Sequence, residues 1–406
     1  MVMTGRTVIN RILLAKGLRG LGDGFVSLLL PLYLLDLGFS PLQVGVIATA
    51  TLLGSGVLTL GVGLHAHRWH QRTLLLAASL LMAATGLGFA NVAGFWPLLV
   101  IAVVGTLNPS SGDVSVFLPL EHAVLSHSAS DKERTAIFAR YSLVGTLAAG
   151  VGSLGAALPA ILAHAAGISM RASLQWMFVL YAALGLLVAL VYRGLPRRGT
   201  ADAPVVAAPL RESRQRIIVL AALFSLDAFG GGFVVQSMVA LWLYQRFGMS
   251  LEVTGVIFFW TGMLTAVSYL VAVRIAKRIG LVNTMVYTHL PSSVCLLLIP
   301  LVPDVGYAIA LLLIRSALSQ MDVPTRSSYV MAIVPPAERP AAASMTSVPR
   351  SLASAASPAL AGYLLSVSTF GWPLIVAGGL KIVYDLLLLA FFRKVRPPEE
   401  ERTART

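Results

Sequence analysis

Charged residues are scarce in this chain, and cysteine is almost absent. Lys, Arg, Asp and Glu together make up 12% of the 406 residues, whereas hydrophobic residues make up 57%. A soluble globular protein carries about 25% charged residues. The composition is therefore a poor fit to a soluble enzyme, a nucleic-acid-binding protein or a disordered chain. The single cysteine, Cys295, excludes any disulfide within the chain.

Acidic residues are the scarcer of the two charged classes. There are 17 Asp and Glu against 30 Lys and Arg, which gives a formal net charge of +13. In a soluble protein such an excess suggests a polyanionic partner, whereas in a membrane protein basic residues collect in cytoplasmic loops. The second interpretation fits the composition better. We therefore expect a lipid bilayer around the protein and no nucleic-acid partner.

Two further features are missing from the sequence. The first apolar run is too long for a cleavable signal peptide and is not followed by an A-x-A-like site. No phosphate-binding loop is present, so ATP-driven transport by this chain alone is not expected. The sequence predicts no cofactor.

What the chain has instead is a nearly continuous series of apolar segments. Because lipid offers no hydrogen-bond partner to an exposed strand edge, each spanning segment must be a helix. At about 20 residues per span, twelve spans use about 240 residues and leave the rest for loops and tails. The predicted spans are residues 11–36, 41–66, 73–93, 95–122, 135–163, 172–193, 215–245, 251–275, 282–303, 305–334, 340–368 and 373–393.

One long polar interruption falls at the middle of the chain. Residues 194–214 hold small residues flanked by basic clusters. We therefore predict an N-terminal six-helix bundle over 1–193, a cytoplasmic linker over 194–214, and a C-terminal six-helix bundle with a short cytoplasmic tail over 215–406. Basic residues gather at both termini and at alternate connections. The positive-inside rule then places both termini in the cytoplasm.

The two halves of the chain resemble each other. Gly38 and Gly45 reappear as Gly248 and Gly255, at an offset of 210 residues. Four further positions match in one register, at an offset of 205: Pro119, Glu121, Glu133 and Arg134 correspond to Pro324, Arg326, Glu338 and Arg339. A parallel duplication of six spans is one of the repeat arrangements of secondary transporters.

The connection between the second and third spans carries a local pattern. It reads Gly63-Leu-His-Ala-His67-Arg68-Trp-His-Gln-Arg72. With its twelve spans, duplication and basic central linker, the chain resembles the major facilitator superfamily over essentially its whole length. That family's signature here is G-x3-D-R-x-G-R-[KR]. The chain keeps the first glycine, the first arginine and the final base, but has His67 at the acidic position.

This resemblance implies a fold and a mode of action. The expected fold is an all-α integral membrane protein, with twelve transmembrane helices in two six-helix pseudo-symmetric bundles around a central cavity. In relatives, helices 1, 4, 7 and 10 line that cavity.

Charged residues inside spans are costly, so they usually face a cavity or a partner. Most of those in this chain fall in the four spans that the resemblance places around the cavity. They are Arg19, Asp23, Asp113, Glu121, Asp227, Arg315, Asp322 and Arg326, with Arg350 in the eleventh span.

Asp23 and Asp227 both lie about 18 Å into their predicted spans, near the middle of a bilayer. Arg19 stands one turn from Asp23, so these two side chains could neutralise each other. Asp227 has no base near it in its own span, and would be neutral or pair with Arg315 or Arg19. We expect Asp227, ahead of Asp23, to carry a coupling proton or to contact the solute. Asp113, Arg315 and Asp322 are further candidates for the cavity.

Glu121 and Arg326 occupy matching repeat positions with opposite charge. The dipeptides Glu133-Arg134 and Glu338-Arg339 follow them at the same separation. One reading is that these are solvated loop charges that contribute little. The other is that they form ion pairs across the pseudo-twofold axis and close the cytoplasmic side. The sequence leaves both open.

His65, His67 and His70 cluster at the same connection as the family motif. No carboxylate or cysteine accompanies them in the sequence, so a basic loop is favoured over a metal site. The sequence predicts no metal site and no catalytic residue.

The leading hypothesis is a secondary transporter driven by an ion gradient, with protons or another ion coupled to a small organic solute. The excess of acids among the intramembrane charges favours a neutral or cationic solute, and hence drug or metabolite efflux. An alternative is transport of an anionic metabolite bound by Arg315 and Arg326. A remote alternative is an integral-membrane enzyme or sensor. We expect a monomer in the plasma membrane, which is the inner membrane if the source is bacterial.

Overall fold

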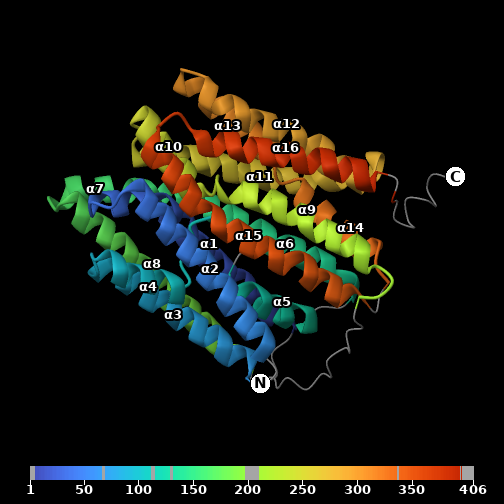
Figure 1. Cartoon of the computed structure of the whole chain (residues 1–406). Coiled ribbons are helices and arrows are strands. Elements are labelled where there is room, and N and C mark those ends of the chain that lie inside the picture. The colour runs from blue at the N-terminus through green and yellow to red at the C-terminus, as the bar shows by residue number, and fades with distance from the viewer. Residues whose placement is uncertain are drawn as a thin grey trace. The chain divides into compact units, whose positions relative to one another are not determined.

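The computed structural model describes residues 5–65, 69–110, 115–128, 131–196, 210–335, 338–393 and 395. Side chains are described for these residues except at positions 63–65, 126–128, 131–136 and 340. Within the described ranges every regular element is a helix (Figure 1). This agrees with the all-helical membrane fold expected from the composition.

Nine segments of the described chain are long and apolar enough to cross a membrane. They are Gly5–Asp36, Pro41–Val62, Gln71–Asn91, Ile137–Ala166, Met170–Arg193, Arg214–Phe247, Leu251–Ile279, Leu281–Leu301 and Trp372–Phe392. The other predicted spans fall on helices that are broken or more polar. These are α4 (Phe95–Val104) with α5 (Phe117–Ser128), α13 (Val305–Leu318) with α14 (Asp322–Ala332), and α15 (Arg339–Val367).

The helices form two compact units. Unit 1 comprises Met1–Ala203 and Val235–Gly262, and unit 2 comprises Pro204–Val234 and Met263–Thr406. The segment 235–262 therefore packs with the first unit, whereas the predicted division at 194–214 assigns it to the second bundle. That three-part division stays a prediction about the arrangement in the membrane.

Unit 1 contains ten helices in whole or in part, with α1 packed against α6 and α3 against α8 (Figure 1). Besides α4 and α5, they are α1 (Gly5–Asp36), α2 (Pro41–His65), α3 (Gln71–Asn91), α6 (Asp131–Leu154), α7 (Leu158–Ala166), α8 (Met170–Arg193), α10 (Gln236–Phe247) and the first part of α11 (Leu251–Ile279). A short 3₁₀ turn, Gly155–Ala157, joins α6 to α7.

Unit 2 is built around α9 (Arg214–Gly232), which packs against α15 and α16 (Trp372–Phe392). It also holds the rest of α11, α12 (Leu281–Leu298), α13 and α14, with a 3₁₀ turn at Ile299–Leu301. Fully buried Phe224, Tyr329, Tyr384 and Leu388 belong to its apolar core. Since these side chains come from α9, α14 and α16, the core fixes the faces that those helices turn inward.

Two predicted spans are broken rather than continuous. The span 95–122 divides into α4 and α5, with Pro109 in the interruption. The span 305–334 divides into α13 and α14 immediately before Asp322 and Pro324. A proline lacks an N–H and clashes with the carbonyl four residues earlier, so it favours a break just before itself. Pro119 and Pro324 each lie in the first turn of the helix that follows the break, α5 and α14.

Glycines let helices approach closely inside each unit. A Cβ at Gly24 would lie 2.1 Å from the carbonyl oxygen of Ala149, and one at Gly152 would lie 2.2 Å from that of Leu21. In unit 2, a Cβ at Gly232 would lie 2.3 Å from the carbonyl oxygen of Ser354. At these three positions the absence of a side chain allows close helix packing.

Candidate functional site

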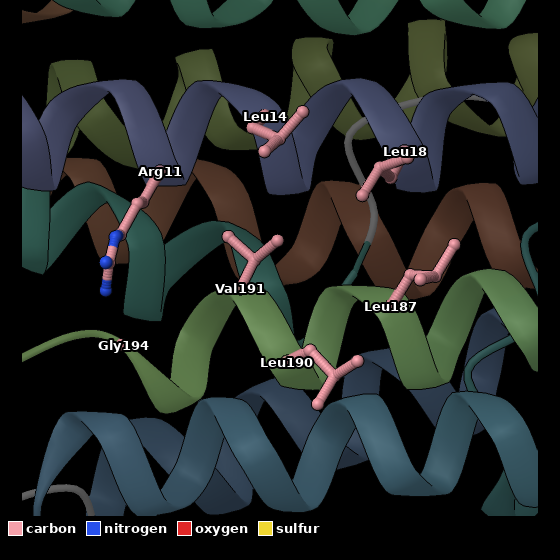
Figure 2. A pocket seen from close by; sticks show the side chains of 7 residues that line it. All are labelled: Arg11, Leu14, Leu18, Leu187, Leu190, Val191 and Gly194. Carbon is pink, nitrogen blue, oxygen red and sulfur yellow. The ribbon is translucent and has the colours of Figure 1, made fainter.

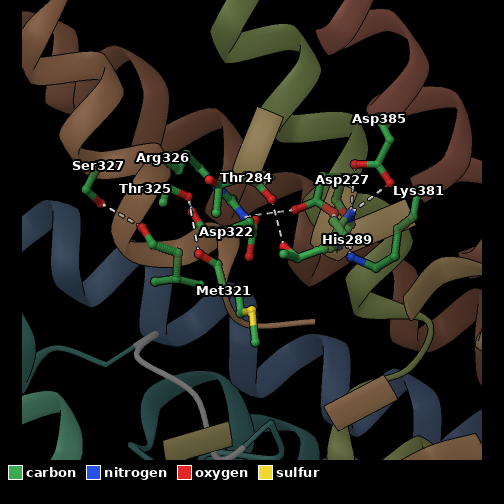
Figure 3. A network of polar contacts seen from close by, with 12 residues as sticks. Asp227, Thr284, His289, Met321, Asp322, Thr325, Arg326, Ser327, Lys381 and Asp385 are labelled. Atoms are coloured by element: carbon green, nitrogen blue, oxygen red, sulfur yellow. Dashed lines mark hydrogen bonds and ion pairs between the residues drawn. The ribbon is translucent and has the colours of Figure 1, made fainter. Parts of the chain in front are cut away.

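A buried network of ionisable side chains lies inside unit 2 (Figure 3). Four helices contribute to it, and all of its side chains are buried. Its members are Asp227 on α9, His289 on α12, Asp322 and Arg326 on α14, and Lys381 and Asp385 on α16. We call these six residues the unit 2 network.

Asp227 is the centre of this network. Lys381 Nζ lies 2.6 Å from its Oδ1, and Arg326 Nη2 lies 3.3 Å from its Oδ2. His289 Nε2 lies 3.6 Å from Oδ1. Three basic groups from three other helices therefore surround one carboxylate that lies about 20 Å from the start of α9.

Helical spacing explains how the carboxylates of Asp322 and Asp385 become part of the unit 2 network. Asp322 and Arg326 are four residues apart on α14 and form an ion pair. Lys381 and Asp385 have the same separation on α16, so both reach one side of that helix. The Asp385 carboxylate oxygens lie 2.9 and 3.0 Å from Nδ1 of His289.

The formal charges of the six residues in the unit 2 network do not cancel when the His289 imidazole is counted as neutral. Three carboxylates face two cations, Lys381 and Arg326, so a neutral imidazole leaves one net negative charge. Burial penalises such an uncompensated charge. Nδ1 of His289 lies 2.9 Å from Asp385 Oδ1, within hydrogen-bond distance, whereas Nε2 faces Asp227 Oδ1 at 3.6 Å, beyond a hydrogen bond. Starting from three ionised carboxylates and a neutral imidazole, the six residues sum to zero charge when one of them carries an additional proton.

Unit 1 contains a smaller buried network around Glu121, which is completely shielded from solvent. Arg19 on α1 forms an ion pair with this carboxylate on α5. Tyr141 Oη on α6 donates at 2.5 Å and Tyr192 Oη on α8 donates at 2.6 Å. The guanidinium of Arg19 also stacks 4.1 Å from the centre of the Phe117 ring. Glu121 thus joins four helices of its unit.

A family model described as Major Facilitator Superfamily matches residues 12–318 of the chain, and matches residues 220–406 as well. The chain belongs to the Major Facilitator Superfamily. Among curated proteins, the uncharacterized membrane protein YJR124C of Saccharomyces cerevisiae is 24% identical to this superfamily member over 410 residues, covering 92% of each chain.

Solved structures of superfamily transporters share this fold over nearly the whole chain. A bacterial homolog of the human lysosomal transporter Spinster, inward-facing and occupied, has a TM-score of 0.76 at 14% identity and covers 97% of both chains. The nucleoside transporter NupG has a TM-score of 0.71 at 11% identity, covering 95% of this chain and 99% of its own. The xylose transporter XylE from E. coli has a TM-score of 0.68 at 14% identity, covering 98% and 99%. At these identities the likeness concerns the fold.

In this superfamily member, the surroundings of Asp227 differ from the sequence expectation. Asp227 was expected to be neutral, or to pair with Arg315 or Arg19. That expectation is wrong, because Lys381, Arg326 and His289 surround it instead. The bases come from other helices, and the pattern within one span cannot reveal them.

Arg19 and Asp23 do not neutralise each other as an isolated pair. Arg19 pairs with Glu121, and Asp23 has a side-chain hydrogen bond with Asn108. Asn108 lies in the interruption between α4 and α5. The break in the fourth span thus brings both partners to α1, which a continuous helix over 95–122 would not do.

Glu121 and Arg326, which the sequence suggested as partners of each other, both have other ion-pair partners. Glu121 is engaged by Arg19 within unit 1, and Arg326 by Asp322 and Asp227 within unit 2. Glu121 and Arg326 occupy corresponding positions of the two repeats. Each of them forms an ion pair with a residue on the first helix of its own unit, Arg19 on α1 and Asp227 on α9.

Glu338 and Arg339 also have local partners in unit 2. The Glu338 carboxylate accepts a hydrogen bond from the Ser213 hydroxyl and from the backbone N–H groups of Arg211, Glu212 and Ser213, at 3.0 to 3.3 Å. These bonds, led by that of the Ser213 hydroxyl, lower the pKa of Glu338 to about 2. Arg339 Nε donates to the carbonyl of Met331 at 3.0 Å.

The remaining predicted positions are less informative. Gly63 lies in α2 and Arg72 in the first turn of α3. Asp113, His67 and Arg68 lie outside the described residues, as do the side chains of Glu133 and Arg134 on α6. Arg315 lies on α13, where its Nε is buried, and it has no ion pair in the described part of the chain.

His289, Lys381 and Asp385 were not among the sequence candidates. A signal for two of them was present, since Lys381 and Asp385 are a charged pair, four residues apart, inside an apolar span. Intramembrane charges mark functional positions by default, so this pair could have been found. His289 has no such companion on its own helix, and only the fold places it beside Asp385.

Proposed function

We propose that this protein is a proton-coupled secondary transporter of a small organic solute, working by alternating access, with the unit 2 network as its coupling site. Membership of the superfamily supports the transport mechanism. The observation that carries the coupling assignment is the balance of charge. Three buried carboxylates face two fixed cations, and the two ring nitrogens of His289 lie 2.9 Å from Asp385 and 3.6 Å from Asp227.

His289 is the group that takes up and releases the proton in this proposal. With the proton bound, the six residues sum to zero charge, and the imidazolium donates from Nδ1 to Asp385 while its Nε2 lies 3.6 Å from Asp227. Without the proton, the network carries one net negative charge in a low-dielectric interior. A cationic solute, or a neutral one with hydrogen-bond donors, can then compensate that charge. Exchange of proton for solute follows, and an inward proton gradient would drive efflux.

Asp227 has an organising role in this account. It holds Lys381 at 2.6 Å and Arg326 at 3.3 Å. A change of charge on His289 therefore alters the electrostatic environment of Asp227, which is the carboxylate that Lys381 and Arg326 share. This supports Asp227 as part of the coupling site, while the exchangeable proton belongs to His289.

A second candidate function rests on Arg315. Its guanidinium has no ion pair in the described residues and its Nε is buried, so it could bind an anionic metabolite. Arg326 is already engaged by Asp322 and Asp227. The anion alternative therefore depends on Arg315 alone rather than on a clamp of two arginines.

The proposal is tested with purified protein in two steps. A melting-temperature screen of cationic, neutral and anionic organic compounds identifies a ligand, because binding to the folded state raises the melting temperature. That compound is then followed into liposomes with and without a pH gradient. Gradient-driven accumulation by the parent protein supports the proposal. Movement that is indifferent to pH contradicts proton coupling, and conversion of the compound without movement indicates an enzyme.

A matched pair of variants locates the coupling site. His289→Gln removes the titratable ring from the network, and His164→Gln makes the same change at an exposed position of α7. The first variant should lose gradient-driven accumulation but keep exchange at equal pH, and the second should behave as the parent. Equal accumulation by both variants would remove His289 from the mechanism.

A further inference from the structure

A second feature of unit 1 is unrelated to the buried networks. A groove of about 500 Å³ lies between α1 and α8 (Figure 2). Its lining consists of Arg11, Leu14, Leu18, Leu187, Leu190, Val191 and Gly194. One end is thus basic, and the remaining wall is aliphatic.

The groove has a direction. Arg11 lies beside Gly194 at one end, while Leu18 and Leu187 lie at the other (Figure 2). Arg11, Leu14 and Leu18 follow one face of α1, at the spacing of helical neighbours. The basic end stands about 9 Å from the first residue of α1 and beside the glycine that ends α8. Leu14 is 55% exposed and Leu190 is 62% exposed, so the aliphatic wall is open on the outside of the unit.

Arg11 lacks a partner that would explain its position. Its Nη1 is buried without a hydrogen-bond acceptor, and none of the described carboxylates forms an ion pair with it. Arg19, two turns along the same helix, is paired with Glu121. Within the described ranges, no carboxylate therefore balances the charge of Arg11.

Gly194 keeps the guanidinium in place. A Cβ at Gly194 would lie 1.5 Å from Arg11 Nη1, so any side chain there must displace the end of the arginine. The backbone at Gly194 has φ −82° and ψ −4°, which lies outside the left-handed region that favours glycine. An alanine at Gly194 would therefore move Arg11 without straining the backbone.

We propose that this groove binds an anionic phospholipid. Its phosphate is held by Arg11, and one acyl chain lies along Leu14, Leu18, Leu187 and Leu190. The distance from Arg11 to Leu18 along α1 is about 10 Å, which accommodates the first part of an acyl chain. A partly buried cation next to an open aliphatic wall complements a molecule that is anionic at one end and apolar along its length. A zwitterionic lipid fits the wall equally well but offers Arg11 no net negative charge.

Native mass spectrometry of the full-length protein tests this site. The probes are phosphatidylglycerol and phosphatidylcholine with identical acyl chains, added in equal amounts. The parent protein should retain phosphatidylglycerol preferentially. Arg11→Ala should lower that preference about fivefold, the equivalent of the ~1 kcal/mol that one basic side chain contributes toward anionic lipid. Gly194→Ala should also lower the preference for phosphatidylglycerol, because it displaces the Arg11 guanidinium.

Two further variants separate this site from general effects. Arg278→Ala removes an exposed base from the end of α11 and should leave the preference unchanged. Leu190→Trp fills the aliphatic wall and should reduce retention of both lipids while Arg11 is intact. Equal retention of the two lipids by the parent protein would overturn the proposal. So would an unchanged preference in Arg11→Ala.

Discussion

Nδ1 of His289 lies 2.9 and 3.0 Å from the two carboxylate oxygens of Asp385. The other ring nitrogen faces Asp227 at 3.6 Å. A neutral imidazole has a single N–H, so it would turn a lone pair toward one of these carboxylates. In our proposal this ring gains and loses the coupled proton, and its charge acts on Asp385 of α16 and on Asp227 of α9.

Asp385→Asn tests this relationship from the acidic side. The substitution removes one negative charge, so the network becomes neutral without a proton on His289. We expect solute movement that no longer depends on the pH gradient. The measurement compares accumulation in liposomes with and without a gradient. A variant that still accumulates solute in proportion to the gradient would show that Asp385 does not set the proton balance.

Asp227→Asn should damage the fold rather than simply mimic a protonated carboxylate. It leaves Lys381 and Arg326 buried with less negative charge, and breaking one partner of a buried pair costs about 3–5 kcal/mol. Adding Lys381→Met should restore part of the loss. Yield and melting temperature of the single and double variants measure this. A double variant less stable than Asp227→Asn would refute the assignment of Lys381 as its principal partner.

A charge swap between the two repeats should fail. Glu121→Arg and Arg326→Glu each place a like charge beside the existing partners, Arg19 in unit 1 and Asp322 with Asp227 in unit 2. The double variant should therefore be no more stable or active than the worse single variant. Rescue by the double variant would mean that these two residues pair with each other during transport.

The Glu338 contacts predict a pH dependence outside the spans. Hydrogen bonds lower its pKa from an ordinary 4.5 to about 2 in the folded protein. Its stabilising contribution is therefore complete above about pH 4.5 and declines as the pH falls toward 2. Glu338→Gln should lower the melting temperature at neutral pH, by an amount that shrinks on acidification. Glu212→Gln, at an exposed neighbouring acid, is the control, and a constant difference for Glu338→Gln would contradict the account.

The distribution of basic residues predicts an orientation in the membrane with both termini in the cytoplasm. In a Cys295→Ser background, Ser250→Cys should react with an impermeant maleimide applied outside intact cells, whereas Thr200→Cys should not. Residue 200 lies in the predicted cytoplasmic linker, and residue 250 lies between the seventh and eighth predicted spans. The reverse labelling pattern would invert the topology.

Helix positions could be predicted from the sequence because lipid leaves the backbone few choices. The apolar runs marked the spans, and Pro119 and Pro324 lie beside the breaks in two of them. The extent of the interruption between α4 and α5 could not be anticipated, since it depends on tertiary contacts such as the hydrogen bond from Ser237 N to the carbonyl of Pro109.

The sites were only partly predictable, for a physical reason. Arg19, Glu121, Asp227, Asp322 and Arg326 could be recognised as costly intramembrane charges. Their partners could not be assigned, because a pair such as Asp227 and Lys381 joins residues 154 positions apart. Helical periodicity relates residues within one helix, and the packing of α9 against α16 is needed to bring these two together.

Proton movement coupled to solute movement tests the central claim most directly. Liposomes containing a pH-sensitive dye, the purified protein and the ligand from the melting-temperature screen are prepared at equal pH on both sides. Imposing a gradient of the ligand alone should move protons through the parent protein and through His164→Gln, but not through His289→Gln, which should still exchange the ligand. Ligand movement through the parent protein without any proton signal, or an undiminished signal from His289→Gln, would contradict the account.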